Sequence, residues 1–154
     1  MDIELQFATE TIEHAGPVEA LTVSPEASLR SVLRTMRTYL TGCVLITRDE
    51  RLVGIFTERD ALRLMARGCD LEAPIANYMV ANPVSIRSGA TIAQAILRMS
   101  SGGYRRLPIV DEQGRPTGVI PVAGIVHYLA ELFPKTVFNM SPEPEAVLHE
   151  REGP

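Results

Sequence analysis

The sequence contains one pattern twice, and this duplication restricts the chain to folds built from two similar halves. Residues 21–29 (LTVSPEASL) align with residues 84–92 (VSIRSGATI) at an offset of 63. Later segments align at an offset of 64: residues 45–46 with 109–110, and 54–56 with 118–120. One copy of about 60 residues buries only a marginal core by itself. We therefore expect two copies that pack against each other.

Each copy has the same order of predicted elements: strand, helix, two strands and helix. Ser28 and Thr91 are favourable helix N-caps, because a side-chain oxygen can accept a hydrogen bond from a backbone N–H of the first turn. Apolar residues follow each cap at helical spacing, and two apolar segments separated by polar turn residues then indicate a β-hairpin. The predicted hairpin strands are residues 43–46 and 52–56, and residues 107–110 and 117–120. The prediction is an α+β fold with two pseudo-symmetric β-α-β-β-α repeats packed through their sheets.

The repeats divide the chain into three parts. Residues 1–70 form the first repeat with an N-terminal segment, and residues 71–133 form a linker helix and the second repeat. Residues 134–154 form a C-terminal tail that we expect to be partly disordered. In the linker, Pro74 favours a short helix over residues 75–79, with residues 8–14 as its expected counterpart.

Composition excludes several classes of protein. The net charge of −4 argues against a nucleic-acid binder, which needs a basic face. No apolar run approaches the roughly 20 residues that cross a bilayer, and the first residues lack a secretion signal. We expect a cytoplasmic protein with neither nucleic acid nor membrane as a partner. The two cysteines and three histidines lack metal-ligand spacing, so no metal site is predicted.

One short segment carries recognisable binding chemistry. Thr57 stands where the second predicted strand gives way to a helix, and Asp60 follows three residues later. The backbone N–H groups of such a helix start and the Thr57 hydroxyl favour an anion, and the Asp60 carboxylate can accept both hydroxyls of a ribose. The same two residues also fit a capping pair that only stabilises the helix. The residues alone leave both interpretations open.

The whole pattern resembles a tandem pair of cystathionine-β-synthase (CBS) domains, also called a Bateman module. The resemblance covers about residues 8–133, and it is carried by these segments: Tyr78-Met79, Asn82-Pro83-Val84-Ser85-Ile86, Ala90-Thr91-Ile92, Arg106-Leu107-Pro108-Ile109-Val110-Asp111 and Gly54-Ile55-Phe56-Thr57-Glu58-Arg59-Asp60. The resemblance implies a stand-alone regulatory module that binds AMP, ADP or ATP, with S-adenosylmethionine or NAD as further candidates. It also implies a homodimer and a regulated protein of unknown identity, and no cofactor is required.

The resemblance also implies which residues form the nucleotide site. Thr57 and Asp60 of the first copy would face these residues of the second: Pro83, Val84, Ser85, Tyr104, Arg105, Arg106 and Pro108. A tyrosine ring can stack on a purine, and arginine can bind phosphate oxygens through two parallel hydrogen bonds. The alternatives are that Tyr104 packs its own loop and that the arginines pair with surface acids such as Glu58 or Asp111.

The second copy departs from this pattern, because Pro121 stands in place of Thr57 and Gly124 in place of Asp60. Proline lacks a donor N–H and glycine offers no group to a ribose, although proline still starts a helix well. We therefore predict one nucleotide site per chain. No set of nucleophile, base and orienting residue is visible, so catalysis is not expected. The alternative function is a ligand-free dimeric protein-interaction module.

Overall fold

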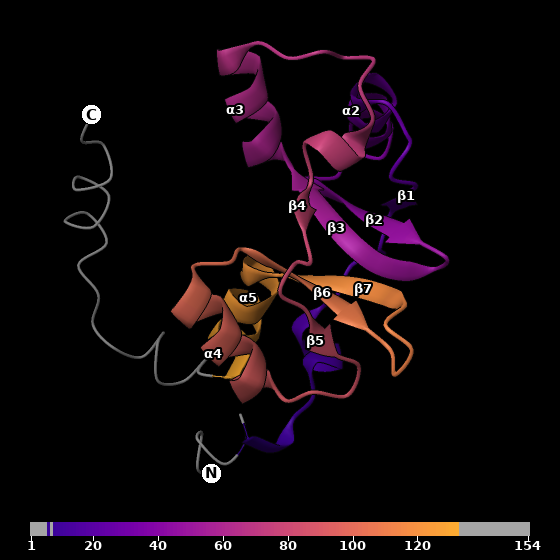
Figure 1. Cartoon of the computed structure of the whole chain (residues 1–154). Helices are drawn as coiled ribbons and strands as arrows, with labels where there is room; N and C mark the ends of the chain where they lie inside the picture. Colours follow the sequence, from indigo (N-terminus) through magenta and orange to yellow (C-terminus); the bar gives the residue numbers. More distant parts are fainter. Residues whose placement is uncertain (1–5, 7, 133–154) are drawn as a thin grey trace, which may run out of the picture.

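Two β-sheets meet at the centre of the molecule. The computed structural model describes residues 6 and 8–132, so the predicted tail at 134–154 lies outside the described residues. Figure 1 shows one sheet with α2 and α3 in the upper half and the other with α4 and α5 in the lower half. The first sheet contains, in spatial order, β1 (Thr22–Val23), β2 (Cys43–Arg48), β3 (Arg51–Thr57) and β4 (Val80–Ala81). The second contains β5 (Ile86–Arg87), β6 (Arg106–Val110) and β7 (Pro116–Pro121).

The helices complete the two predicted repeats. The α-helices are α2 (Leu29–Thr38), α3 (Glu58–Arg67), α4 (Ile92–Gly102) and α5 (Val122–Leu132). Ser28 caps α2 by accepting from Ser31 N at 3.1 Å, and Thr91 caps α4 in a reciprocal pair with Gln94. The order β1-α2-β2-β3-α3 is repeated as β5-α4-β6-β7-α5. The predicted α+β class and the two β-α-β-β-α repeats are therefore confirmed.

Apolar side chains from both sheets form the contact between the repeats. Cys43, Leu45 and Ile55 of the first sheet and Val119 of the second belong to one buried cluster. Their side chains are at most 9% exposed. The repeats thus pack through their sheets, as the sequence predicts, because neither copy can bury both faces of its own sheet.

The strand register corrects the sequence alignment by one residue. Val23 pairs with Ile46 in the first copy, and Ile86 pairs with Ile109 in the second. Ile46 is therefore equivalent to Ile109, at an offset of 63, and the alignment of residues 45–46 with 109–110 is wrong. Ile46 faces Gly54 whereas Ile109 faces Gly118, so the additional residue lies in the second hairpin. The first hairpin turns tightly at two residues with positive φ, Asp49 and Glu50.

Each repeat is completed by the segment that precedes the other repeat. The 3₁₀-helix η1 (Ile12–Ala15) packs on the second repeat, where Ile12 N donates to Ala90 O at 2.9 Å. The 3₁₀-helix η2 (Ile75–Asn77) packs on the first, where Ile75 N donates to Ala27 O at 2.7 Å. Division of the chain at residue 70 therefore separates the two repeats in sequence. In the folded protein, η1 and η2 each pack on the repeat on the other side of that boundary. In the linker, η2 is shorter than the helix predicted over residues 75–79.

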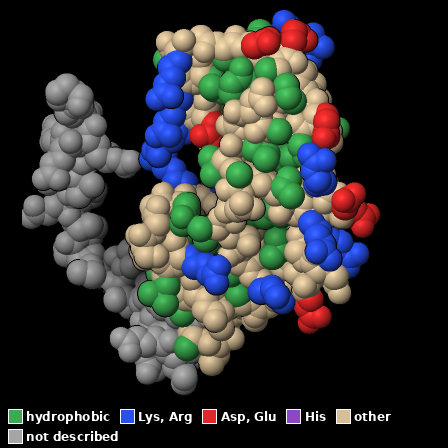
Figure 2. All heavy atoms as spheres, viewed as in Figure 1, with side chains coloured by type: hydrophobic (Ala, Val, Ile, Leu, Met, Phe, Trp, Pro, Cys, Tyr) green, Lys and Arg blue, Asp and Glu red, His purple; other side chains and the backbone are tan. Residues whose placement is uncertain are grey.

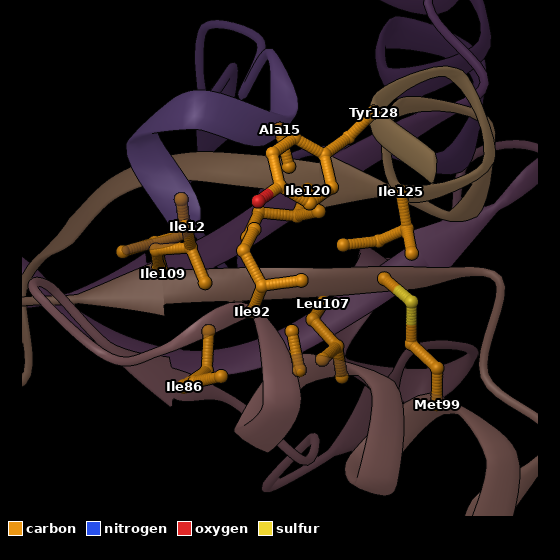
Figure 3. Close-up of a cluster of buried hydrophobic side chains, with 11 residues drawn as sticks. Ile12, Ala15, Ile86, Ile92, Met99, Leu107, Ile109, Ile120, Ile125 and Tyr128 are labelled. Atoms are coloured by element: carbon orange, nitrogen blue, oxygen red, sulfur yellow. The ribbon is translucent and has the colours of Figure 1, made fainter. Parts of the chain in front are cut away.

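Both leading segments contribute isoleucines to the hydrophobic cores. Figure 3 shows Ile12 and Ala15 of η1 beside Ile92 of α4 and Ile120 of β7, in the core of the second repeat. Ile75 has the same position in the core of the first repeat. Both isoleucines have an exposed fraction of 0%. Neither core is closed without a segment from outside its own repeat.

Replacement of either isoleucine by alanine tests this exchange. We expect Ile12→Ala and Ile75→Ala each to lower the free energy of unfolding by about 2–5 kcal/mol, because each deletes fully buried methyl groups. Urea denaturation followed by circular dichroism gives the measurement. Leu97→Ala is the control, since Leu97 is 67% exposed, and its effect should stay within about 0.5 kcal/mol. Losses below about 1 kcal/mol for both isoleucines would show that the segments are not part of the cores.

Candidate ligand-binding site

A cleft of about 410 Å³ opens between the two repeats. One wall is the end of β3 and the start of α3, in the first repeat. The other walls are the residues after β4, the loop after α4 and the start of β6. Eight of the nine residues predicted as nucleotide contacts line it: Thr57, Asp60, Pro83, Val84, Tyr104, Arg105, Arg106 and Pro108. Whether these residues contact a ligand stays a prediction.

Ser85 is the predicted residue that does not line this cleft. It directly precedes β5, and its carbonyl oxygen accepts a hydrogen bond from Arg98 Nη1 of α4. Adjacent residues in extended backbone point in opposite directions. Val84 therefore lines the cleft, whereas the next residue, Ser85, does not.

Thr57 and Asp60 form a complete capping box at the start of α3. Thr57 N and Thr57 Oγ1 donate to Asp60 Oδ2 at 2.9 and 3.0 Å, and Asp60 N donates to Thr57 Oγ1 at 3.4 Å. Glu58 N donates to Gly42 O at 2.9 Å. Most donors of this helix start are therefore engaged within the protein. Asp60 lines the cleft, and its Oδ1 accepts no hydrogen bond within residues 8–132.

Tyr104 forms part of the opposite wall and is 40% exposed. Its ring packs directly over Gly102, where a Cβ atom would overlap ring atoms. Gly103 ends α4 with a φ of 68°, a left-handed conformation that glycine adopts without strain. The two glycines thus hold the ring against the loop, and 40% of Tyr104 stays accessible from outside.

Arg106 joins the two repeats across the cleft. Its Nη2 lies 3.3 Å from Glu58 Oε1, and the Arg106 side chain is 28% exposed against 65% for Glu58. The guanidinium occupies the space where a Cβ of Gly42 would stand. Of the two acids predicted as alternative partners, Glu58 is the one that pairs with Arg106, whereas Asp111 pairs with Arg115 at 2.8 Å.

The pKa of the Cys43 thiol is changed by burial and by the two charges of the Arg106–Glu58 ion pair. Burial raises the pKa of the Cys43 thiol, while the Arg106 charge opposes that increase and the Glu58 charge adds to it. A thiol with a raised pKa stays protonated and unreactive at neutral pH. Cys43, which is 6% exposed, is thus a packing residue.

Sequence reasoning missed Arg63 and Asn82, which also line the cleft. Arg63 follows Arg59 by four residues and Asp60 by three, so all three lie near one face of α3. That spacing was visible in the sequence. Asn82 has a φ of 49°, and no sequence signal linked it to the cleft.

The equivalent position in the second repeat is closed by backbone. A Cβ atom at Gly124 would overlap the carbonyl oxygen of Ala15 in η1. A side chain such as that of Asp60 has no room there. Pro121, which replaces Thr57, is the last residue of β7.

The chain belongs to the CBS domain family, because residues 16–67 and 75–131 match that family in two successive copies. It is 30% identical over 116 residues to the CBS domain-containing protein YhcV of Bacillus subtilis, a match that covers 75% of this chain and 82% of YhcV. Other relatives are longer. The chain spans 20% of CBSCBSPB1 of Arabidopsis thaliana at 29% identity over 71% of this chain. It spans 26% of an inosine-5'-monophosphate dehydrogenase of Methanocaldococcus jannaschii at 28% identity over 82% of this chain.

Solved structures share the fold at low sequence identity. The CBS domain pair of MJ0100, crystallised with 5'-methylthioadenosine and S-adenosyl-L-methionine, has a TM-score of 0.70 and 18% identity. The match covers 77% of this chain and 98% of that one. CBSX2 in complex with AMP has a TM-score of 0.66 and 18% identity, with coverages of 80% and 98%. At these identities the likeness establishes the fold of a CBS domain pair.

Two kinds of feature, a metal-binding cluster and a membrane-spanning helix, are absent from the described residues. Within residues 6 and 8–132, no group of three histidine, cysteine or acidic side chains is arranged to hold a metal ion. No helix in that part of the chain is both long and apolar enough to span a membrane.

Substitution of Gly124 tests the closure of the second position. Alanine is the better helix former by about 1 kcal/mol, yet we expect Gly124→Ala to lower the free energy of unfolding by about 1–3 kcal/mol, because the new methyl group meets the rigid backbone of Ala15. Thermal and urea denaturation measure the change. Ala123→Ser, at the exposed neighbouring position, should stay within about 0.5 kcal/mol. A stabilised Gly124→Ala protein would contradict the contact.

Proposed function

We propose that this CBS pair is a regulatory module that binds one adenosyl ligand per chain in the cleft between its repeats. The ligand class is AMP, ADP or ATP, with S-adenosylmethionine and NAD as further candidates. The observation that carries the proposal is the arrangement of the walls. A carboxylate at a helix start in one repeat faces an accessible aromatic ring and two arginines in the other.

Each part of an adenosine nucleotide has a complementary group in this cleft. The Asp60 carboxylate, with Oδ1 unengaged in the described chain, suits the vicinal hydroxyls of a ribose. The ring of Tyr104 suits a purine face, and the backbone around Pro83 and Val84 suits the purine edge. Arg105 and Arg106 suit phosphate. Support also comes from two proteins of the same fold, which were crystallised with AMP or with S-adenosylmethionine and methylthioadenosine.

The second repeat has lost the equivalent chemistry, which supports one site per chain. Gly124 offers no carboxylate, and Ala15 occupies the space that one would need. The CBS fold does not depend on that carboxylate, since α5 forms without it.

A ligand in the cleft would connect the repeats, and this supports a regulatory role. Thr57 and Asp60 belong to the first repeat, and Tyr104 and Arg106 to the second. Binding to both walls stabilises one relative placement of the repeats, and regulation requires such differential affinity between two states. We further propose a cytoplasmic homodimer that acts on another protein and is not an enzyme. The match to inosine-5'-monophosphate dehydrogenase spans 26% of that enzyme's length, so the likeness does not extend to the rest of the enzyme.

The alternative is a ligand-free dimeric interaction module, and the capping box favours it. Thr57 and Asp60 satisfy each other without any ligand. Several apolar side chains on the helices are exposed, which suits a protein partner: Leu62, Met65, Leu97 and Val126. In that case Asp60 contributes only to the stability of α3.

Two matched substitutions separate these functions. Asp60 and Gln94 occupy the same position in two capping boxes, and Gln94 does not line the cleft. Asp60→Ala and Gln94→Ala should each cost less than about 2 kcal/mol of stability through the lost cap. We expect Asp60→Ala alone to weaken binding of ATP, ADP or AMP by about tenfold to a hundredfold, because a hydrogen bond to a charged group is lost. Isothermal titration calorimetry measures the binding.

Equal affinities in the wild type and Asp60→Ala would rule out this site. If no adenosyl compound binds the wild type and a partner protein still does, the interaction module is the function.

A further inference from the structure

The cleft contains more positive charge than the protein itself neutralises. Four arginines line it, Arg59, Arg63, Arg105 and Arg106, against two acids, Glu58 and Asp60. Arg106 pairs with Glu58, and Asp60 Oδ2 is occupied by the Thr57 backbone N–H and hydroxyl. Within residues 8–132, Arg59, Arg63 and Arg105 have no hydrogen-bond or ion-pair partner from their side chains. Three guanidinium groups without a partner in that range therefore line one cavity, whose lining has two more positive than negative side chains.

Two of these arginines lie on one ridge of α3. Arg59, Arg63 and Arg67 follow one another at intervals of four residues, which places them above one another on a helix. Figure 2 shows a column of blue side chains along the edge of the half that holds α3, ending at the hollow between the halves. Like charges at this spacing destabilise a helix, and Arg59 in the first turn opposes the helix dipole. Glu58 and Asp60 in the same first turn suit the dipole, so the cost that remains is the repulsion along the ridge of Arg59, Arg63 and Arg67.

We propose that the cleft selects its adenosyl ligand by the number of phosphates, and that it takes an adenosine di- or triphosphate in preference to AMP. This inference rests on the proposed function of the same site. A single phosphate carries a charge of about −2, which is half the charge of the four guanidinium groups of Arg59, Arg63, Arg105 and Arg106. A second and third phosphate supply the missing charge and the missing length along α3. S-adenosylmethionine, whose sulfonium group is cationic, meets repulsion from the same arginines.

Arg63 is the residue that distinguishes the ligands. It lies one helical turn beyond Arg59, further from the start of α3, where Asp60 would hold the ribose. It is therefore placed to contact a phosphate distant from the sugar. Arg67, a further turn along, does not line the cleft. Arg63 and Arg67 carry the same charge, and both are exposed residues of α3. They differ in that only Arg63 lines the cleft.

Glu58 acts as an internal competitor of the phosphates. It holds Arg106 at 3.3 Å and is itself 65% exposed, so a ligand phosphate can replace it at little cost. When the ion pair with Arg106 breaks, the Glu58 carboxylate would turn toward solvent, and the Arg106 guanidinium would bind the ligand phosphate instead. Glu58→Gln should therefore tighten ATP binding several-fold.

The test is calorimetric titration of the full chain with ATP, ADP, AMP, adenosine and S-adenosylmethionine, each with and without Mg²⁺. We expect ATP to bind at least about tenfold more tightly than AMP, as one added charged hydrogen bond predicts. Arg63→Gln should weaken ATP binding by about tenfold to a hundredfold and AMP binding by less than about threefold. Arg67→Gln, the matched control, should change both by less than about threefold.

The outcomes separate this inference from the proposed function. Equal binding of ATP and AMP, tighter binding of S-adenosylmethionine than of AMP, or an equal loss for all ligands in Arg63→Gln overturns the phosphate selectivity. The adenosyl site itself still stands in that case, provided that Asp60→Ala weakens binding of these ligands by about tenfold or more. If no adenosyl ligand binds, or if Asp60→Ala binds them all as the wild type does, the proposed function and this inference both fail.

Discussion

The exchange of leading segments between the repeats is the contact on which the rest of the structure depends. Ile12 closes the core of the second repeat and Ile75 closes the core of the first. Because each segment crosses to the other half, the repeats are held in one relative placement by backbone hydrogen bonds and buried side chains together. The cleft exists only in that placement, since its walls come from both repeats. The proposed ligand, which contacts both walls, would therefore depend on the arrangement of the halves.

Duplication has separated the requirements of the fold from those of the site. Both repeats keep the capped helix, the hairpin and the buried isoleucines. Only the first keeps Thr57 and Asp60, while the second has Pro121 and Gly124 in their places. A helix can start at proline as well as at a capped threonine. The loss of Asp60's equivalent thus leaves the packing intact and allows Ala15 to approach Gly124 closely.

The Asp60 carboxylate completes the helix cap and is also the group that we propose for ribose binding. One oxygen, Oδ2, accepts from Thr57 and completes the cap, which orients the carboxylate before any ligand arrives. The other oxygen, Oδ1, accepts no hydrogen bond within the described residues. Such preorganisation reduces the entropy lost on binding. Arg106 is held in a similar way by Glu58 and by the bare backbone of Gly42. The two predicted interpretations of Thr57 and Asp60, cap and binding site, are therefore compatible in geometry.

The sequence by itself determined the repeated β-α-β-β-α order and the caps at Ser28 and Thr91, because these depend on local periodicity and on neighbours a few residues away. It also identified eight of the residues that line the cleft, through the resemblance to CBS pairs. Only the tertiary structure decided the exchange of η1 and η2, the pairing of Arg106 with Glu58, the register of the second hairpin and the position of Ser85 outside the cleft. Each of these joins residues far apart in the chain or depends on a one-residue shift. Such contacts are fixed by how apolar faces and charges meet in space, which the order of residues along one strand or helix does not specify.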